Sequence, residues 1–280
     1  MRGRAANGWR TAGALAVAVL FAMPLLLMVS GSLRPAGTAA PPTPDLLPSP
    51  ASVDSYRVAV ELGGLGRAAL VSLAVAALAV PLSVLVASWA GFAMTQVSRR
   101  WAQALAAASV VALMVPVTAL LVPRFVLYRM LGLTDTLVPL VLPALLATSP
   151  FYVLVYYLAF RAVPGDLYDA ARLADLSPLR TWWQVAMPLV RPVSAAVAAL
   201  VFVLTWSSFV EPLVYVYDRD LFTVPLALRS LSTLDRSDYS VFLAGAVLAS
   251  IPALVLFAMA QRWFLQVDRR PGWWGRGDVR

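Results

Sequence analysis

Residues 163–192 read VPGDLYDAARLADLSPLRTWWQVAMPLVRP and separate two long apolar runs of the chain. The runs are LVPLVLPALLATSPFYVLVYYLAF at 137–160 and VSAAVAALVFVLTWSSFVEPLVYVY at 193–217. Each is longer than the roughly 20 apolar residues that an α-helix needs to cross a bilayer. The 30 residues between them exceed what two neighbouring membrane helices need to turn around. We therefore expect this polar segment to have a function of its own.

The composition indicates a membrane protein and excludes several kinds of chemistry. Of 280 residues, 61% are hydrophobic and 13% are charged, whereas a soluble domain has about 25% charged residues. The chain has no cysteine and no histidine, and all 22 basic residues are arginine. The sequence therefore lacks thiols, the commonest zinc and haem ligand, and the lysine of a P-loop. We expect no cofactor bound by this chain and no nucleotide held by a P-loop of its own.

Six apolar runs are long enough to cross a bilayer. They are residues 11–30, 68–94, 104–123, 137–160, 193–217 and 241–264. The first run follows basic residues, as the core of a secretory signal does, but its length of about 19 residues exceeds the usual 7–15. A retained span is favoured, and a cleaved signal is the alternative. The predicted fold class is an all-α polytopic membrane protein with six transmembrane helices across 11–264.

The arginines set the predicted topology. With residues 1–10 in the cytoplasm, the inside segments hold 14 arginines and five acidic residues, and the outside segments hold 8 arginines and nine acidic residues. Cytoplasmic loops carry the excess of basic residues in membrane proteins. The net charge of +8 is thus attributed to topology and not to nucleic-acid binding. Both termini, including the tail 265–280, and the loop 161–192 are predicted to be cytoplasmic.

The loop 161–192 has the pattern of two short helices. The first is expected over 166–175, where one apolar face repeats at helical spacing. Its members are Leu167, Ala170, Ala171 and Ala174. Asp169 and Arg172 stand three residues apart and are expected to pair on another face.

The second helix is expected to begin at Ser177-Pro178, because serine is a good N-cap and proline is favoured at the first helical position. It is expected to end at Met187-Pro188, because proline cannot donate to the preceding turn. Two interpretations of the resulting L-shaped pair stand side by side. One is an interfacial amphipathic hairpin with its tryptophans at the lipid headgroups. The other is a docking element for a cytoplasmic partner, since small alanines suit close helix contact better than lipid.

The same residues resemble the EAA loop of ABC-importer permeases. That pattern is EAA, three residues, glycine, nine residues, an aliphatic residue, any residue, then LP. Asp169-Ala170-Ala171 stands at EAA, Asp175 at the glycine, Val185 at the aliphatic position and Met187-Pro188 at LP. FRAVPGDLYDAA is similar to FRSIPKELEEAA of maltose- and glycerol-phosphate-type permeases. Further similar pieces are PLLLMVSGSLRP at 24–35, MVPVTALLVP at 114–123, LGLTDTLVPLVLP at 131–143, TWSSFVEPL at 205–213 and TVPLALRSL at 223–231.

The resemblance implies a type I ABC importer permease fold in a bacterial inner membrane. It implies a second, different permease subunit, two ATPase subunits that carry ATP and Mg, and an extracytoplasmic binding protein that delivers a sugar-like solute. The docking residues that it implies are Asp169, Ala170, Ala171, Arg172, Asp175, Leu176, Ser177 and Pro178. Asp175 in place of glycine is a departure, because aspartate is less free at positive φ. We expect Asp175 to act there as a turn residue at the end of the first helix.

The expected solute pathway runs past the fifth apolar run. Its candidates are Trp206, Ser207, Ser208 and Glu211. An aromatic ring beside hydroxyls suits a sugar, and an acidic residue in or near a membrane span is a functional candidate by default. The alternative places Glu211-Pro212 at the outer interface, in contact with the binding protein or an arginine.

Two other classes of protein are weighed against the importer. An ion-coupled carrier calls for several buried ionisable residues and an inverted repeat, but Glu211 stands nearly alone. A membrane-embedded glycosyl- or lipid-processing enzyme calls for clustered acids or histidines. Only the Asp218-Arg219-Asp220 stretch comes near this, and it is interpreted as a solvated loop.

Overall fold

The structure is a computed structural model that describes residues 2–41, 46–146, 149–234 and 239–267. Every regular element in these residues is a helix. The chain forms two compact units, Met1–Ala69 with Val224–Pro252 and Leu70–Thr223 with Ala253–Arg280. Of the expected cytoplasmic tail 265–280, residues 268–280 lie outside the described residues.

The first unit is held together by serine hydroxyls that meet backbone carbonyls. It contains α1 (Arg2–Ser32), α2 (Asp54–Glu61), α13 (Val224–Leu234), and the first turns of α3 (Leu65–Gln96) and α14 (Tyr239–Val267). Ser55 Oγ donates to the Arg34 carbonyl at 2.6 Å, and Ser240 Oγ donates to the Pro35 carbonyl at 2.9 Å. Both serines are fully buried, so these bonds fix the turn after α1 against α2 and α14.

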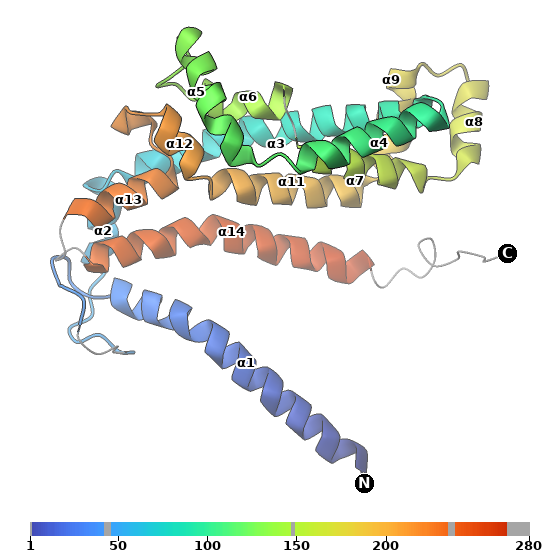
Figure 1. Ribbon diagram of the computed structural model, residues 1–280. Helices are drawn as coiled ribbons and strands as arrows, with labels where there is room; N and C mark the ends of the chain where they lie inside the picture. The colour runs from blue at the N-terminus through green and yellow to red at the C-terminus, as the bar shows by residue number, and fades with distance from the viewer. Residues whose placement is uncertain (1, 42–45, 147–148, 235–238, 268–280) are drawn as a thin grey trace. The chain divides into compact units, whose positions relative to one another are not determined.

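The second unit contains the rest of α3 and α14 and most of the short helices. In chain order these are α4 (Arg99–Leu113), η1 (Val117–Leu120), α5 (Leu121–Met130), α6 (Val138–Leu146), α7 (Pro150–Arg161), α8 (Gly165–Leu173), α9 (Pro178–Thr181), the π-helical η2 (Trp182–Ala186), α10 (Met187–Leu189), α11 (Arg191–Trp206), α12 (Val210–Tyr215) and η3 (Arg219–Leu221). Within this unit, α8 and α9 lie at one end, and α5 and α12 lie at the other (Figure 1).

Four helical segments are long and apolar enough to cross a membrane, and two bent pairs raise the number to six among the described residues. The four are Gly13–Ser32, Leu65–Gln96, Val138–Arg161 and Tyr239–Gln261, of which the third runs across the undescribed residues 147–148. The bent pairs are Arg99–Leu113 with Val117–Met130, at 82°, and Pro178–Leu189 with Arg191–Trp206, at 85°.

Two of the predicted spans are not straight helices. The third is interrupted before Pro116, which has an extended backbone (φ −62°, ψ 127°). A proline disfavours the helical conformation in the residue before it, so the chain turns here. The fifth was predicted to run to residue 217, but α11 ends at Trp206 and the separate short helix α12 follows.

A close crossing of α3 and α7 builds the core on which the loop 161–192 rests. A Cβ atom added at Gly91 would lie 2.7 Å from the Tyr156 Cβ and 2.8 Å from the Tyr157 backbone nitrogen. Only glycine therefore permits this approach. Beside this crossing, the rings of Phe92, which follows Gly91, and Phe160, one turn after Tyr156, meet edge to face with centroids 5.6 Å apart.

Candidate functional site

The helix α8 rests on the protein through two residues and exposes the rest of its surface. Of the predicted apolar face, only Ala171 is buried, at 4% exposure, and Leu167 is 40% exposed. Tyr168 makes the second contact, because its hydroxyl donates to the Phe160 carbonyl at 3.0 Å. Burial raises the pKa of Tyr168 to about 12. Ala170 and Ala174 thus face outward, where a partner can reach them, whereas Ala171 faces the protein.

The corner after α8 is a Schellman motif. Asp175 has a left-handed backbone (φ +49°), and its amide donates to the Arg172 carbonyl at 3.0 Å. The Leu176 amide donates to the Ala171 carbonyl, also at 3.0 Å. These are the two bonds that define the motif, in which the residue at positive φ is usually glycine. Asp175 therefore acts as the turn residue expected from the sequence, in the conformation that a glycine would adopt.

The second helix of the loop begins as predicted and ends later. Ser177 Oγ accepts from the Arg180 amide at 3.4 Å, and Pro178 stands at the first helical position. Pro188 does not end the helix: the chain stays helical to Leu189. The residues before it form a π-turn in which the Met187 amide donates to the Trp182 carbonyl. This wider turn accommodates a proline that has no amide proton of its own.

Two adjacent tryptophans face opposite ways at this π-turn. Trp182 is 4% exposed and packs edge to face against Trp89, with ring centroids 5.5 Å apart. Trp183 is 65% exposed. Trp182 thus packs the second helix of the loop into the core beside α3. The contact between Trp182 and Trp89 connects the corner to α3.

The exposed tip of the loop combines charge with apolar side chains. Asp169 and Arg172 pair at 3.1 Å as predicted, with both side chains about two-thirds exposed or more. A pair this exposed adds little stability, so it remains available to a partner. Leu173 is 89% exposed and Leu179 is 59% exposed. Leu173 carries no signal in the sequence, because it lies off the alanine face and only the left-handed turn at Asp175, two residues later, places it at the tip.

The structure brings two of the four pathway candidates, Ser208 and Glu211, into contact with each other. Ser208 Oγ donates to Glu211 Oε2 at 3.3 Å, and Glu211 Oε1 lies 3.8 Å from Arg124 Nη1. Trp206 is 6% exposed and stacks on Phe202. Ser207 is exposed and donates to the Val203 carbonyl of its own helix at 2.7 Å. The structure thus joins Ser208 to Glu211 and pairs Glu211 with Arg124, the kind of arginine contact that the alternative interpretation expected without naming the residue.

Ser208 and Glu211 line a small polar cavity of about 140 Å³. The other lining residues come from several elements: Ser72, Val75, Leu140, Leu204, Thr205, Pro212 and Thr223. Five of the nine side chains carry oxygen. No sequence pattern could collect them, because they lie as far apart in the chain as Ser72 and Thr223.

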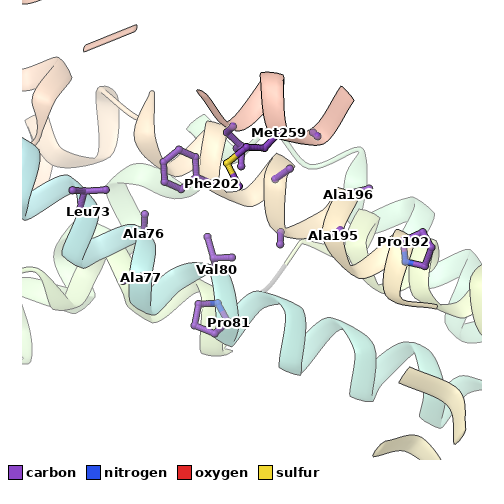
Figure 2. A pocket seen from close by; sticks show the side chains of 14 residues that line it. Leu73, Ala76, Ala77, Val80, Pro81, Pro192, Ala195, Ala196, Phe202 and Met259 are labelled. Atoms are coloured by element: carbon purple, nitrogen blue, oxygen red, sulfur yellow. The ribbon is translucent and has the colours of Figure 1, made fainter. Parts of the chain in front are cut away.

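A larger cavity of about 610 Å³ lies between α3, α11 and the C-terminal half of α14. Its walls are alanines with Phe202, Pro81 and Met259, and Figure 2 shows only carbon and sulfur atoms at the side-chain tips. Such a surface suits a lipid tail or an apolar helix but offers nothing to a hydroxyl group. The smaller cavity is therefore the candidate for a polar solute.

Asp135 ties the loop after α5 to the end of α12. It has φ +60°, and its Oδ1 accepts from the Asp218 amide at 2.7 Å and the Tyr217 amide at 2.9 Å. These two bonds lower the pKa of Asp135. Asp218 in turn accepts from the Asp220 amide at 2.9 Å, a local turn in the Asp218-Arg219-Asp220 stretch. Within the described part of the chain, no group of three acids is placed to hold a metal ion.

Residues 62–271 match the family described as the binding-protein-dependent transport system inner membrane component. The chain belongs to this family. The match covers most of the chain, including the loop 161–192 and the Ser208–Glu211 cavity. It confirms the resemblance drawn from the EAA-like loop.

Individual relatives extend the match beyond the family segment. The chain is 30% identical over 195 residues to a lactose transport system permease protein of Rhizobium radiobacter, covering 70% of this chain and 71% of the relative. It is 29% identical over 262 residues to an arabinooligosaccharides transport system permease protein of Halalkalibacterium halodurans, covering 91% and 92%.

A solved structure has the same fold. It is a crystal structure of a bacterial ABC transporter involved in the import of the acidic polysaccharide alginate, with a TM-score of 0.80 at 18% identity. The match covers 94% of this chain and 98% of the other. The solved structure thus shows an all-α fold shared with this chain, and the family match makes the chain an inner membrane component of a binding-protein-dependent transport system. Neither the ion-coupled carrier nor the membrane enzyme is favoured.

Proposed function

We propose that this permease imports a sugar or a sugar-like solute and is driven by ATPase subunits that dock on the loop 161–192. The relatives for lactose and arabinooligosaccharides support the carbohydrate class. The proposed complex contains this chain, a second and different permease, two ATPase subunits, and an extracytoplasmic binding protein. ATP and Mg belong to the ATPase subunits, and residues 1–10 and the tail 265–280 lie in the cytoplasm.

One observation carries this proposal: the fixed, exposed corner between α8 and α9. Its eight proposed docking residues all lie between Asp169 and Pro178, and most of them are exposed. Ala171 and Leu176 are the ones turned inward, and their backbone atoms bond to each other. A rigid exposed corner can transmit a push, whereas a flexible loop would absorb it.

Two side-chain contacts and one helix crossing connect the loop 161–192 to the membrane helices. Tyr168 holds α8 to the end of α7, and Trp182 holds the second helix to α3. The Gly91 crossing locks α3 and α7 together. Closure of the ATPase subunits would thus move these helices as a body and alternate the access of the solute pathway, which we place beside Trp206, Ser207, Ser208 and Glu211.

The test replaces residues 166–178 with a glycine–serine linker of equal length in the complete importer. Membrane insertion should persist, because the six apolar runs are untouched. ATPase co-purification and solute uptake should both be lost. If the ATPase subunits still co-purify and uptake persists, this loop does not couple them to the permease.

A further inference from the structure

The small polar cavity lies where the helix of the fifth apolar run breaks. α11 ends at Trp206 and α12 begins at Val210, so Thr205 lies in the last turn of α11, Ser208 lies in the break and Glu211 lies in the first turn of α12. Ser72 faces them from α3, and Thr223 closes the cavity from the chain after η3. Non-helical backbone at membrane depth is tolerated where it lines a cavity or is buried in protein.

Thr223 supplies an independent sign of a ligand. Its side chain is 3% exposed, and its hydroxyl has no hydrogen-bond partner among the residues that the structure describes. Burial of a hydroxyl without a partner is unfavourable, and native structures rarely leave one. Thr223 is one of the residues that line the cavity, so an occupant of the cavity is the candidate partner for this hydroxyl.

Glu211 keeps acceptor capacity for such a group. An ionised carboxylate can accept about four hydrogen bonds, and the structure uses it for a 3.3 Å bond from Ser208 and a 3.8 Å ion pair with Arg124. Both contacts are long for their kind. A solute hydroxyl can therefore donate to Glu211 without displacing a strong bond.

The lining selects the chemistry of the occupant. Hydroxyls of Ser72, Thr205 and Thr223 both donate and accept, while Val75, Leu140 and Pro212 form apolar walls. A sugar ring presents the same alternation, with hydroxyls on its edge and C–H groups on its face. A metal cation is disfavoured, since Arg124 already stands by the carboxylate. The volume of about 140 Å³ equals that of about four to five waters, which fits one edge of a ring and not a whole disaccharide.

We infer that this cavity is a saccharide subsite carried by this subunit, in which Glu211 and Thr223 hold neighbouring hydroxyls of one ring. The inference rests on the proposed carbohydrate importer and adds to it that this chain contacts the solute directly. The break between α11 and α12 then has a role, because it lets α12 shift, and a shift of α12 changes the distance between Glu211 and Thr223 and releases the ring.

The absence of natural cysteine in this chain gives a direct test. Thr223→Cys and, as a second site, Thr205→Cys are introduced singly into the complete importer in nanodiscs. A small cationic methanethiosulfonate modifies the thiol, and mass spectrometry of this chain gives the rate. Lactose, maltose and arabinotriose are the probes, with and without ATP and vanadate. Ser232→Cys is the control, because Ser232 is exposed and does not line the cavity.

The expected result is protection at the cavity only. At a sugar concentration of about ten times its dissociation constant, modification should slow about tenfold, because only the free fraction reacts. The rate at position 232 should not change. Adding Glu211→Gln should raise the half-protecting concentration about tenfold, since a charged acceptor is lost. Arg124→Gln, which breaks the same ion pair but keeps the carboxylate, should change it by less than about threefold.

Other outcomes overturn the inference. They are equal rates with and without all three sugars, thiols at 223 and 205 that never react, or protection that survives Glu211→Gln unchanged. Equal rates would mean that no sugar enters the cavity, unreactive thiols would mean that the cavity is closed to solutes, and protection unchanged by Glu211→Gln would mean that Glu211 holds no sugar hydroxyl. ATP-dependent uptake and ATPase co-purification are measured on the parent complex in parallel. Their loss counts against the proposed function, whereas their persistence without protection counts against the subsite alone.

Discussion

The backbone amide of Leu176 donates to the carbonyl of Ala171 at 3.0 Å, across the left-handed residue Asp175. This bond closes the corner between the two helices of the loop 161–192. It is a local bond of five residues' separation, so the shape of the corner is set by its own sequence. A corner formed in this way can be presented to a partner without help from the rest of the chain.

Replacement of Asp175 tests the backbone of this corner. Asp175→Gly should keep ATPase binding and uptake, and should raise the free energy of unfolding by up to about 1 kcal/mol, because glycine adopts positive φ without strain. Asp175→Val should lower it by about 1–2 kcal/mol, because a β-branched side chain clashes there. Melting temperature and uptake measure both effects. Equal behaviour of the two variants would mean that the left-handed turn is not required.

Leu173 is predicted to be the main apolar anchor of the tip. Leu173→Asp should weaken ATPase binding about 30-fold or more, as loss of a central interface residue costs about 2 kcal/mol or more. Insertion and melting temperature should not change, because the side chain is 89% exposed. The matched control is Leu47→Asp, at 87% exposure, which should bind normally. Normal retention of the ATPase subunit by the Leu173 variant would remove this residue from the docking surface.

Because burial raises the pKa of Tyr168, we expect the folded protein to lose stability at alkaline pH. The pKa is raised to about 12 in the folded protein, from about 10 when unfolded. Its contribution is therefore complete below about pH 10 and is lost as the pH rises from about 10 to 12. Tyr168→Phe should lower stability by about 0.5–1.5 kcal/mol at neutral pH, through loss of the bond to Phe160. The same variant should also lose less stability than the parent protein as the pH rises from about 10 to 12, which melting temperatures measured across this pH range would show. An unchanged alkaline slope would show that Tyr168 is not buried in this contact.

Gly91 is predicted to tolerate no side chain. Gly91→Ala should lower stability by about 1–3 kcal/mol, because the added methyl meets the backbone and Cβ atoms of α7. Gly165→Ala is the control, since a Cβ there has nothing within 4 Å. Melting temperatures in detergent compare the two. If the Gly91 variant melts no lower than the Gly165 variant, α3 and α7 do not cross as closely as described.

Local chemistry made part of this structure predictable. Ser177-Pro178 start a helix through a side-chain cap and a preset φ, and both effects lie within a few residues. The pairing of Asp169 with Arg172 likewise follows from helical spacing. Four of the six apolar runs coincide with helical segments long and apolar enough to cross a membrane, because length and composition decide where such segments form.

The remaining features depend on residues distant in sequence. The π-turn before Pro188 places Trp182 against Trp89, a contact that no pattern within the loop reveals. The polar cavity needs Ser72, Glu211 and Thr223 together, and each looks ordinary in its own segment. Arg124 lies 87 residues from its partner Glu211. The sequence therefore indicated the carboxylate of this ion pair but not which arginine pairs with it.

Photo-crosslinking at Leu173 is the most direct measurement of whether this corner docks on the ATPase. Benzoyl-phenylalanine is placed at position 173, or at the equally exposed position 47, of the complete importer and is irradiated in intact membranes. Position 173 should crosslink to an ATPase subunit, and position 47 should not. Capture of the external binding protein at position 173, or of the ATPase subunit at position 47, would contradict both the topology and the coupling role.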